Sequence, residues 1–293
     1  MIVVFGSINL DLIFPLPAIP RAGETLLTPA IRIEPGGKGA NQAVAASRDG
    51  AQVIMAGAVG RDALATGALT LLRQAGIDLT RVISADAATG CAAIFVDPKG
   101  ANAIGVASGA NLAVRASQVE DALLGPATTL VLQAEVPTGE TAALIRRARA
   151  RGARIILNLA PAGPIELAAL RAIDLLTVNE TEAAWLGAHL GSGTDAAALR
   201  DALGVTVVRT LGEDGADVAT RAGVQRVPAR RVTPIDTTAA GDCFVGVLAA
   251  ALDRGAPLVE ALTRASAAAA LCCTRAGSQS SLPTAAETDA LLS

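Results

Sequence analysis

Aromatic residues are scarce in this sequence, and so are lysines. Aromatics make up 2% of the chain, without a single tyrosine, and Lys38 and Lys99 are the only lysines. Proteins that bind nucleic acids or anionic membranes usually present a basic surface, and those that bind single strands add aromatic side chains for stacking. Because the net charge is −3, we expect neither a nucleic acid nor a membrane as a partner.

Cysteine and histidine are too few and too scattered for a metal centre built on them. The cysteines show none of the CxxC or Cys/His spacings of zinc sites; they are Cys91, Cys243, Cys272 and Cys273. We therefore expect reduced, buried thiols, as in a cytoplasmic protein. The single histidine, His189, is not accompanied by a GxSxG motif, which disfavours a hydrolytic triad. We expect it to be exposed in a loop at residues 187–193.

Long apolar runs are absent as well. The longest, residues 243–252 and 265–273, are shorter than the roughly 20 residues that span a bilayer. The first residues lack the basic start and the cleavage site of a signal peptide, so residues 2–5 are interpreted as a strand. With 293 residues and 52% hydrophobic content, the chain can bury a large core. We expect an ordered cytoplasmic protein built around one main domain.

Short β-branched runs alternate with Ala- and Leu-rich stretches along most of the chain. The expected strands are residues 2–5, 53–58, 129–133, 154–158, 175–178 and 205–209. The expected helices are residues 40–48, 63–75, 116–124, 138–151, 181–186 and 196–203. Continuous apolar strands separated by helices predict an α/β protein with a mostly parallel central sheet covered on both faces, a three-layer α/β/α fold. Ligands bind such sheets beyond the carboxyl ends of the strands.

Two segments interrupt this alternation. Residues 12–35 are rich in proline, and residues 91–106 read as a β-hairpin that turns at residues 97–100. We expect them to pair as a small β-sheet that covers the main domain as a lid or forms a dimer contact. The main domain would then consist of residues 1–11, 36–90 and 107–293, and the lid of residues 12–35 and 91–106.

Residues 236–244 place a carboxylate at the start of an apolar helical run. Asp242 follows three small residues, Ala239, Ala240 and Gly241. Small residues leave room for an anion at the unpaired N–H groups of a helix N-terminus. A carboxylate beside such an anion site is the arrangement that phosphoryl transfer to a hydroxyl requires. The alternative is that Asp242 only caps a buried helix.

Two motifs near the N-terminus suit a small polar ligand. Asn9 and Asp11 are two residues apart, so their side chains can point to the same side of an extended segment. In the glycine-rich stretch 36–42, Lys38 and Asn41 accompany bare backbone; the stretch is not a Walker A loop, because glycine follows the lysine. The structural alternatives are a strand-ending turn for the first motif and a flexible hinge for the second.

Two further motifs follow predicted strands. Asn179 and Glu182 have the spacing of a capping box, which is a sufficient structural explanation. The functional alternative is a polar cluster that orients water on Mg²⁺ beside phosphate groups. Residues 210–215 form a glycine-containing turn, either a plain hairpin turn or a nucleotide contact.

Taken together and in order, these motifs closely resemble those of the PfkB carbohydrate kinase family over essentially the whole chain. The resemblance rests on residues 6–11, 36–45, 89–96, 158–161, 179–182, 210–215 and 236–244. The pair Gly-Gly-Lys-Gly-Ala-Asn and Asp-Thr-Thr-Ala-Ala-Gly-Asp is its most specific part. The resemblance implies the family's three-layer α/β/α fold with a β-sheet lid, and a homodimer joined through that lid.

The resemblance also implies a role for each motif. The sugar would be held by Asn9, Asp11, Gly37, Lys38, Asn41, Glu135 and Asp242. ATP would be contacted by Asn179, Thr210, Gly212, Gly215, Gly241 and Ser266. Asp242 would be the general base, with the amides of Ala240 and Gly241 as the anion hole. Glu182 would order Mg²⁺ through water. A K⁺ ion would be held by Asp236, Thr238, Cys272, Arg275, Gly277 and Ser281, several of them through backbone carbonyls.

The activity implied by the resemblance is ATP-dependent phosphorylation of D-ribose at its 5-hydroxyl, with Mg²⁺ required and K⁺ as an activator. Kinases that act on deoxyribose, fructose, a sugar phosphate or a nucleoside are the alternatives within the family. The scarcity of aromatic side chains disfavours a stacked nucleobase in the acceptor site. Alternatives of other classes are a non-catalytic sugar-binding regulator on the same scaffold and a hydrolase that uses His189.

Overall fold

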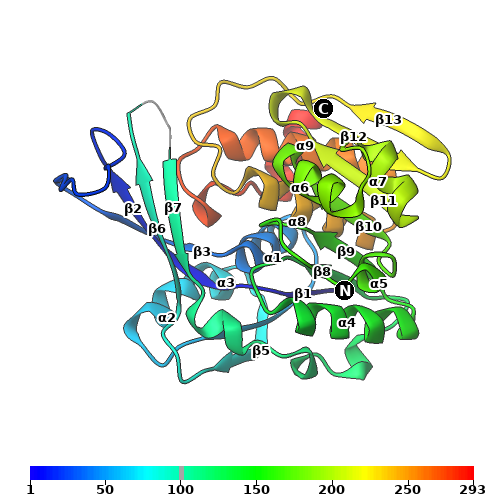
Figure 1. Ribbon diagram of the computed structural model, residues 1–293, viewed down its shortest axis with the longest axis horizontal. Helices are drawn as coiled ribbons and strands as arrows, with labels where there is room; N and C mark the ends of the chain where they lie inside the picture. The colour runs from blue at the N-terminus through cyan, green and yellow to red at the C-terminus, as the bar shows by residue number, and fades with distance from the viewer. Residues whose placement is uncertain (99–101) are drawn as a thin grey trace.

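Two β-sheets of different size organise the chain (Figure 1). The computed structural model describes residues 1–98 and 102–293, so Lys99 and Gly100 of the predicted hairpin turn lie outside the described residues. A nine-stranded sheet runs through the larger part of the molecule, and a four-stranded sheet projects from one side of it, at the left in Figure 1.

The large sheet is mostly parallel, as predicted. Its strands are β1 (Ile2–Phe5), β4 (Val53–Val59), β5 (Asp78–Ser84), β8 (Thr129–Leu132), β9 (Arg154–Asn158), β10 (Leu175–Val178), β11 (Thr206–Thr210), β12 (Ala216–Thr220) and β13 (Gly223–Val227). They lie in the order β13-β12-β11-β10-β9-β8-β1-β4-β5, and β12 pairs antiparallel with both of its neighbours. Every residue of β1 is buried, because this strand lies inside a sheet with both faces covered.

Helices cover both faces of the large sheet. They are α1 (Lys38–Arg48), α2 (Ala63–Ala68), α3 (Thr70–Gln74), α4 (Thr138–Arg151), α5 (Leu167–Leu170), α6 (Glu180–Leu190), α7 (Ala196–Leu203), α8 (Ala240–Asp253), α9 (Leu258–Cys273) and α10 (Ala285–Leu292). On one face Ile2 and Val4 pack with α1, α8 and α9; on the other Val3 and Phe5 pack with α4, α6 and α7. The three-layer α/β/α prediction is therefore confirmed. Within the described ranges, none of the helices combines the length and apolarity needed to cross a bilayer.

The small sheet joins the two segments that were predicted to pair. Its strands are β2 (Asn9–Pro15), β3 (Arg32–Gly36), β6 (Gly90–Val96) and β7 (Asn102–Ala107), in the order β3-β2-β6-β7. Strand β2 pairs from its first residue, with Asn9 opposite Gly36 on β3 and Gly90 on β6. The sheet therefore begins before residue 12, where the predicted lid starts, and it brings the polar Asn9–Asp11 motif onto its own first strand.

Residues 116–124 do not form the predicted helix. Two short 3₁₀ turns replace it, η2 (Ala116–Gln118) and η3 (Asp121–Leu123). The side chain of Gln118 caps the start of the first turn, because its oxygen accepts the backbone N–H of Arg115. Its amide also donates to carbonyl groups of β4 and β5, which ties the segment to the sheet edge. These long-range bonds outweigh the helical propensity of the segment.

Some predicted elements differ in extent. Residues 63–75 form two helices, α2 and α3, and strands β5, β12 and β13 were not predicted. Strands β5 and β13 lie at the sheet edges, where partly exposed residues give no continuous apolar run. His189 lies in α6 and not in a loop, because the helix continues to a left-handed Gly191; it is exposed as expected and stacks on Trp185. All cysteines are free: Cys243 and Cys272 are buried, whereas Cys91 and Cys273 are partly exposed.

Candidate active site

The start of helix α8 has an unusual backbone. Ala239, the residue before the helix, adopts a φ of 60°, a conformation that residues with a side chain rarely adopt. No side chain caps this helix, so the hypothesis that Asp242 serves only as its cap is wrong. The N–H of Ala240 makes a long bond of 3.3 Å to the carbonyl of Thr237, which an incoming anion would have to share or displace. The first turn of α8 thus offers amide donors next to a carboxylate.

The carboxylate of Asp242 is held by two amide side chains of α1. Asn41 Nδ2 donates to Asp242 Oδ2 at 2.9 Å, and Gln42 Nε2 donates to Oδ1 at 2.9 Å. Asp242 is 7% exposed, so these bonds form in a nearly dry site. Asn41 Oδ1 is buried and has no hydrogen-bond partner, so it remains available to accept from a ligand hydroxyl.

Helices α1 and α8 approach each other closely at this point. A Cβ at Gly246 would lie 2.4 Å from the backbone oxygen of Gln42, so only glycine fits there. Gln42 is fully buried, and its amide also donates to Asn158 Oδ1 at 3.0 Å. Its oxygen accepts from Gln133 Nε2 at 2.7 Å. A chain of amides therefore orients Gln42, and Gln42 in turn orients Asp242.

The glycine-rich loop before α1 is tied to the carboxylate of Glu135. The same oxygen, Oε2, accepts the Ser7 hydroxyl at 2.5 Å and the backbone N–H of Lys38 at 3.0 Å. Gly37 has a φ of 89°, and a Cβ there would lie 2.8 Å from the backbone nitrogen of Asn9. The glycine-rich loop consequently passes close to the start of β2. This proximity allows residues of both segments to contact one small ligand.

Asn9 and Asp11 lie on strand β2 and are both nearly buried. Asn9 Oδ1 accepts from Asn111 Nδ2 at 2.7 Å, which leaves the Asn9 amide group free to point elsewhere. A Cβ at Gly36 would lie 2.1 Å from Asp11 Oδ2, so the carboxylate occupies the space above this glycine. The structure therefore brings the Asn9–Asp11 motif and the glycine-rich loop together, as predicted from the sequence.

The sugar side of the site concentrates negative charge. Burial raises the pKa of Asp11 to about 7. That value already includes the carboxylates of Glu135, Glu34 and Asp242, which add to the effect of burial, and the Lys38 ammonium, which opposes it. Asp242 in turn raises the pKa of Lys38, although burial acts in the opposite direction. Lys38 therefore stays charged and balances part of the carboxylate cluster.

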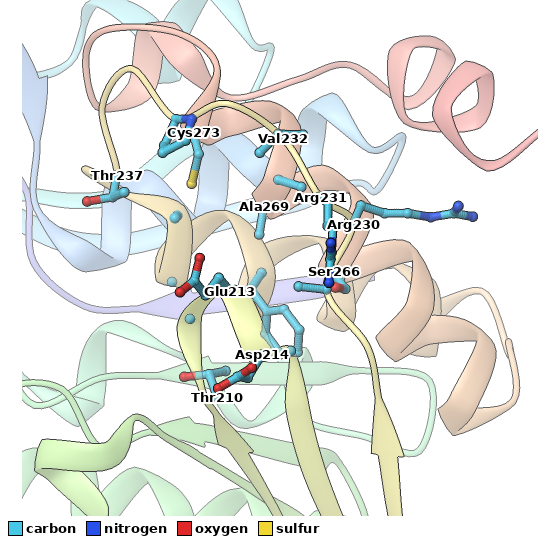
Figure 2. Close-up of a pocket in the computed structure, with 18 residues that line it drawn as sticks. Thr210, Glu213, Asp214, Arg230, Arg231, Val232, Thr237, Ser266, Ala269 and Cys273 are labelled. Carbon is cyan, nitrogen blue, oxygen red and sulfur yellow. The ribbon is translucent and has the colours of Figure 1, made fainter.

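A cavity of about 800 Å³ lies beyond the carboxyl end of β11 (Figure 2). Thr210 and the 3₁₀ turn η4 (Gly212–Asp214) form one wall, and Ser266 and Cys273 of α9 contribute another. Its lining includes the predicted nucleotide residues Thr210, Gly212, Gly215, Gly241 and Ser266. The hydroxyl of Ser266 lies 3.3 Å from the carbonyl of Pro228 and is engaged with the wall.

A second cavity, of about 210 Å³, lies next to the first around Asp242. Asn179, the remaining predicted nucleotide residue, lines this one together with Lys38 and Glu182. The predicted capping box is confirmed: Glu182 accepts the N–H of Asn179 through Oε2, and Asn179 accepts the N–H of Glu182, both at 2.8 Å. Burial raises the pKa of Glu182, against the hydrogen bond from Asn179 and the charge of Lys38. A partly free carboxylate facing a polar cavity fits a hydrated Mg²⁺.

The residues expected around a monovalent cation also come together. Asp236 accepts the N–H groups of Thr238 at 2.9 Å and of Gly277 at 3.1 Å. Burial raises the pKa of Asp236, but these hydrogen bonds outweigh it, so the pKa is lowered overall. Cys272 Sγ lies 3.0 Å from Ser281 Oγ and 3.7 Å from the carbonyl of Thr238. Among the described residues, no group of three or more His, Cys, Asp and Glu side chains could hold a metal.

The side chain of Arg275 does not face this cluster. It donates to Glu287 Oε1 at 2.7 Å, so only its backbone carbonyl could turn towards an ion. The oxygen atoms that remain are a carboxylate, hydroxyl groups and carbonyls, which is the donor chemistry of a hard cation.

Three residues that organise the site were not predicted to do so: Ser7, Gln42 and Asn158. All three lie inside the motif ranges 6–11, 36–45 and 158–161, and Gln42 directly follows Asn41. The bonds from Ser7 to Glu135, from Gln42 to Asn158 and from Gln42 to Asp242 join residues 128, 116 and 200 positions apart along the chain. The motifs therefore include these residues, but which side chains they bind depends on how the helices and strands pack.

Known proteins with similar sequences and structures identify the family. The family described as pfkB family carbohydrate kinase matches residues 1–285. The ribokinase of Haemophilus influenzae is 37% identical over 97% of this chain and 96% of its own. The crystal structure of a Thermotoga maritima ribokinase superposes with a TM-score of 0.91 at 32% identity, over 99% of this chain and 98% of that one. The Arabidopsis thaliana ribokinase complexed with ribose and ATP gives 0.89 at 29% identity, with the same coverage. The chain therefore belongs to the pfkB family of carbohydrate kinases.

Proposed function

We propose that this protein transfers the γ-phosphoryl group of ATP to the 5-hydroxyl of D-ribose, giving D-ribose 5-phosphate and ADP. One observation carries the proposal: Ala240 and Gly241, at the first turn of α8, line both the large cavity and the small one that contains Asp242. A phosphoryl donor in the large cavity would therefore meet an acceptor hydroxyl at a carboxylate and a set of amide donors.

Asp242 is the general base in this proposal. Its carboxylate accepts the hydroxyl proton as the oxygen attacks phosphorus, and Asn41 and Gln42 hold it in place. The amides of Ala240 and Gly241 would stabilise the charge that develops on the transferred group. Mg²⁺ bound with ATP, near Glu182, would neutralise phosphate charge. Lys38 lines the small cavity around Asp242, so it contributes a positive charge there.

The acceptor site suits a small sugar with several hydroxyl groups. Asp11 and the unpartnered Asn41 Oδ1 are acceptors, and the Asn9 amide is a donor. Glu135 accepts the backbone N–H of Lys38 and so ties the glycine-rich loop before α1 to this site. Relatives and structural neighbours that carry the name ribokinase support ribose as that sugar.

We also propose that K⁺ activates the enzyme from the cluster around Asp236. The donor set fits, because the Asp236 carboxylate binds the N–H groups of Thr238 and Gly277, and Cys272 contacts both the Thr238 carbonyl and the Ser281 hydroxyl. The cluster also adjoins the start of α8: Thr238 directly precedes Ala239, the N-cap of this helix. An ion there would order the backbone that forms the anion site.

We further propose a homodimer joined through the small sheet. Ile33 on β3 is 58% exposed, and Ile104 and Val106 on β7 are 56% and 50% exposed. Apolar side chains on the two edge strands support pairing with a second copy. Light scattering after size-exclusion chromatography tests this: twice the chain mass of 29.2 kDa is expected. A monomer at every concentration would contradict the proposal.

The activity is tested by measuring ADP release with a panel of acceptors. D-ribose should give much faster release than 2-deoxyribose, fructose or a nucleoside, and the product should carry phosphate on O5. The rate should require Mg²⁺ and rise when K⁺ replaces a large organic cation. ADP release that is indifferent to every acceptor would overturn the assignment. Sugar binding without any ADP release would instead favour a non-catalytic regulator.

A further inference from the structure

The loop that carries two of the proposed cation ligands also holds strand β3. Ser278 donates its backbone N–H to Glu34 Oε2 at 2.9 Å and its hydroxyl to the carbonyl of Pro35 at 2.7 Å. The amide of Gln279, in the turn η5 (Gln279–Ser281), donates to the carbonyl of Gly36 at 3.4 Å. Three consecutive residues of β3 are therefore bound by two consecutive residues of this loop.

The contact between this loop and Glu34 leaves no spare room. Gly277 has a φ of 105°, and a Cβ there would lie 2.6 Å from Glu34 Oε2. The N–H of Gly277 donates to Asp236, and the next N–H donates to Glu34. The guanidinium group of Arg32 lies near the carboxylates of both Glu34 and Asp236. Its Nε is 3.7 Å from Glu34 Oε1, and its Nη2 is 4.0 Å from Asp236 Oδ2. One turn is thus held from the large domain by Asp236 and from the small sheet by Glu34.

Strand β3 leads directly into the sugar side of the site. Glu34 lies opposite Asp11 on β2, and Gly36 lies opposite Asn9. The next residue, Gly37, is the N-cap of α1 and is followed by Lys38. Because Asp11 Oδ2 occupies the space over Gly36, a displacement of β3 would move the backbone against which this carboxylate lies.

We propose that Glu34 and Ser278 are positioning residues for the acceptor sugar. Their hydrogen bond fixes the segment 34–38 against the loop 277–281, so that a monovalent cation bound by this loop strengthens sugar binding. This inference rests on the proposed function, since it takes ribose and K⁺ as the ligands. Glu34 lines neither cavity of the site, so it would act on the sugar through the position of β3 and not by direct contact.

Calorimetric titration of ribose into purified variants tests the role of Glu34. Glu34→Ala should weaken ribose binding about tenfold and leave ADP binding within about twofold of the wild type. Glu34→Gln keeps an oxygen that accepts the N–H of Ser278, so it should restore affinity to within about threefold. Glu24→Ala is the matched control: Glu24 also accepts a backbone N–H, from Arg21, within residues 12–35.

The cation supplies the second readout. Wild-type protein should bind ribose more tightly in K⁺ than in choline buffer, and Glu34→Ala should lose most of this difference. Wild-type affinity in Glu34→Ala, or a Glu34→Gln variant that binds ribose as weakly as Glu34→Ala, would overturn the inference.

If Glu34→Ala does not fold, Ser278→Ala decides: it removes only the hydroxyl bond to Pro35 and should weaken ribose binding about threefold. Unchanged ribose affinity in folded Ser278→Ala would then overturn the inference.

Failure of this inference is distinguishable from failure of the proposed function. If wild-type protein does not bind ribose at all, the proposed substrate is wrong, and the same variants are compared with the sugar that the acceptor panel identifies. If the wild type binds its sugar and the variants bind it equally well, only the positioning role is wrong.

Discussion

The amide nitrogen of Gln42 donates to one carboxylate oxygen of Asp242 at 2.9 Å, in the contact between helices α1 and α8. The other carboxylate oxygen accepts from Asn41. The two hydrogen bonds therefore fix the orientation of the Asp242 carboxylate before any substrate binds. A general base needs this kind of preorganisation.

Asp242→Asn tests the role of the carboxylate. The amide has the same shape but cannot accept the hydroxyl proton, so turnover should fall by about 10²–10⁴-fold. ADP affinity and the thermal midpoint should change little. Steady-state kinetics with ribose and ATP, ADP titration and thermal unfolding measure these three quantities. Unchanged turnover would show that Asp242 is not the base.

Gln42→Leu tests whether the orientation of Asp242 matters. The variant removes the hydrogen bond to Asp242 Oδ1, so kcat should fall by about tenfold or more. KM for ATP should be retained, because the substitution disturbs the orientation of the base and removes no contact to ATP. Gln133→Leu is the graded control, since it removes only the support of Gln42. A smaller loss of kcat is expected there, and an equal loss in both variants would favour a general packing defect.

Asp11 should couple stability to pH. Its folded-state pKa is about 7 against 3.8 for an ordinary aspartate, so between these values the folded state binds more protons than the unfolded chain. The contribution of this group to stability is therefore present at low pH and is lost as the pH rises towards 7. Asp11→Asn should remove this loss, at the expense of sugar binding.

Urea unfolding of the sugar-free protein at pH 5.5 and pH 8 measures this effect. The variant should gain at least about 1 kcal/mol over the wild type at pH 8 and less at pH 5.5, because one unit of pKa shift corresponds to about 1.4 kcal/mol. A gain that is independent of pH would mean that Asp11 titrates normally.

Gly36→Ala should weaken sugar binding strongly. The new Cβ would lie 2.1 Å from Asp11 Oδ2, so the carboxylate or strand β3 has to move. We expect KM for ribose to rise by about a hundredfold, with nucleotide affinity preserved. Gly139→Ala is the control, because a Cβ there has no neighbour within 4 Å. Normal ribose kinetics in Gly36→Ala would contradict the placement of Asp11 in the sugar site.

Local patterns predicted most of the fold. Strand β9 and helix α4 have the predicted bounds, because a short β-branched run and an Ala- and Leu-rich stretch are properties of a short segment of the chain. Residues 116–124 failed as a helix for the converse reason: Gln118 is bound to carbonyl groups of β4 and β5, which no local pattern contains.

The motifs alone indicated the family, and that resemblance is confirmed. Only the tertiary structure decided how the residues of the site act on one another. The bonds from Gln42 to Asp242 and from Ser278 to Glu34 join residues 200 and 244 positions apart. The raised pKa of Asp11 likewise comes from burial and from carboxylates on other elements. Residue types and spacing follow from the chain itself, whereas distance, burial and charge at the site arise when separate elements pack together.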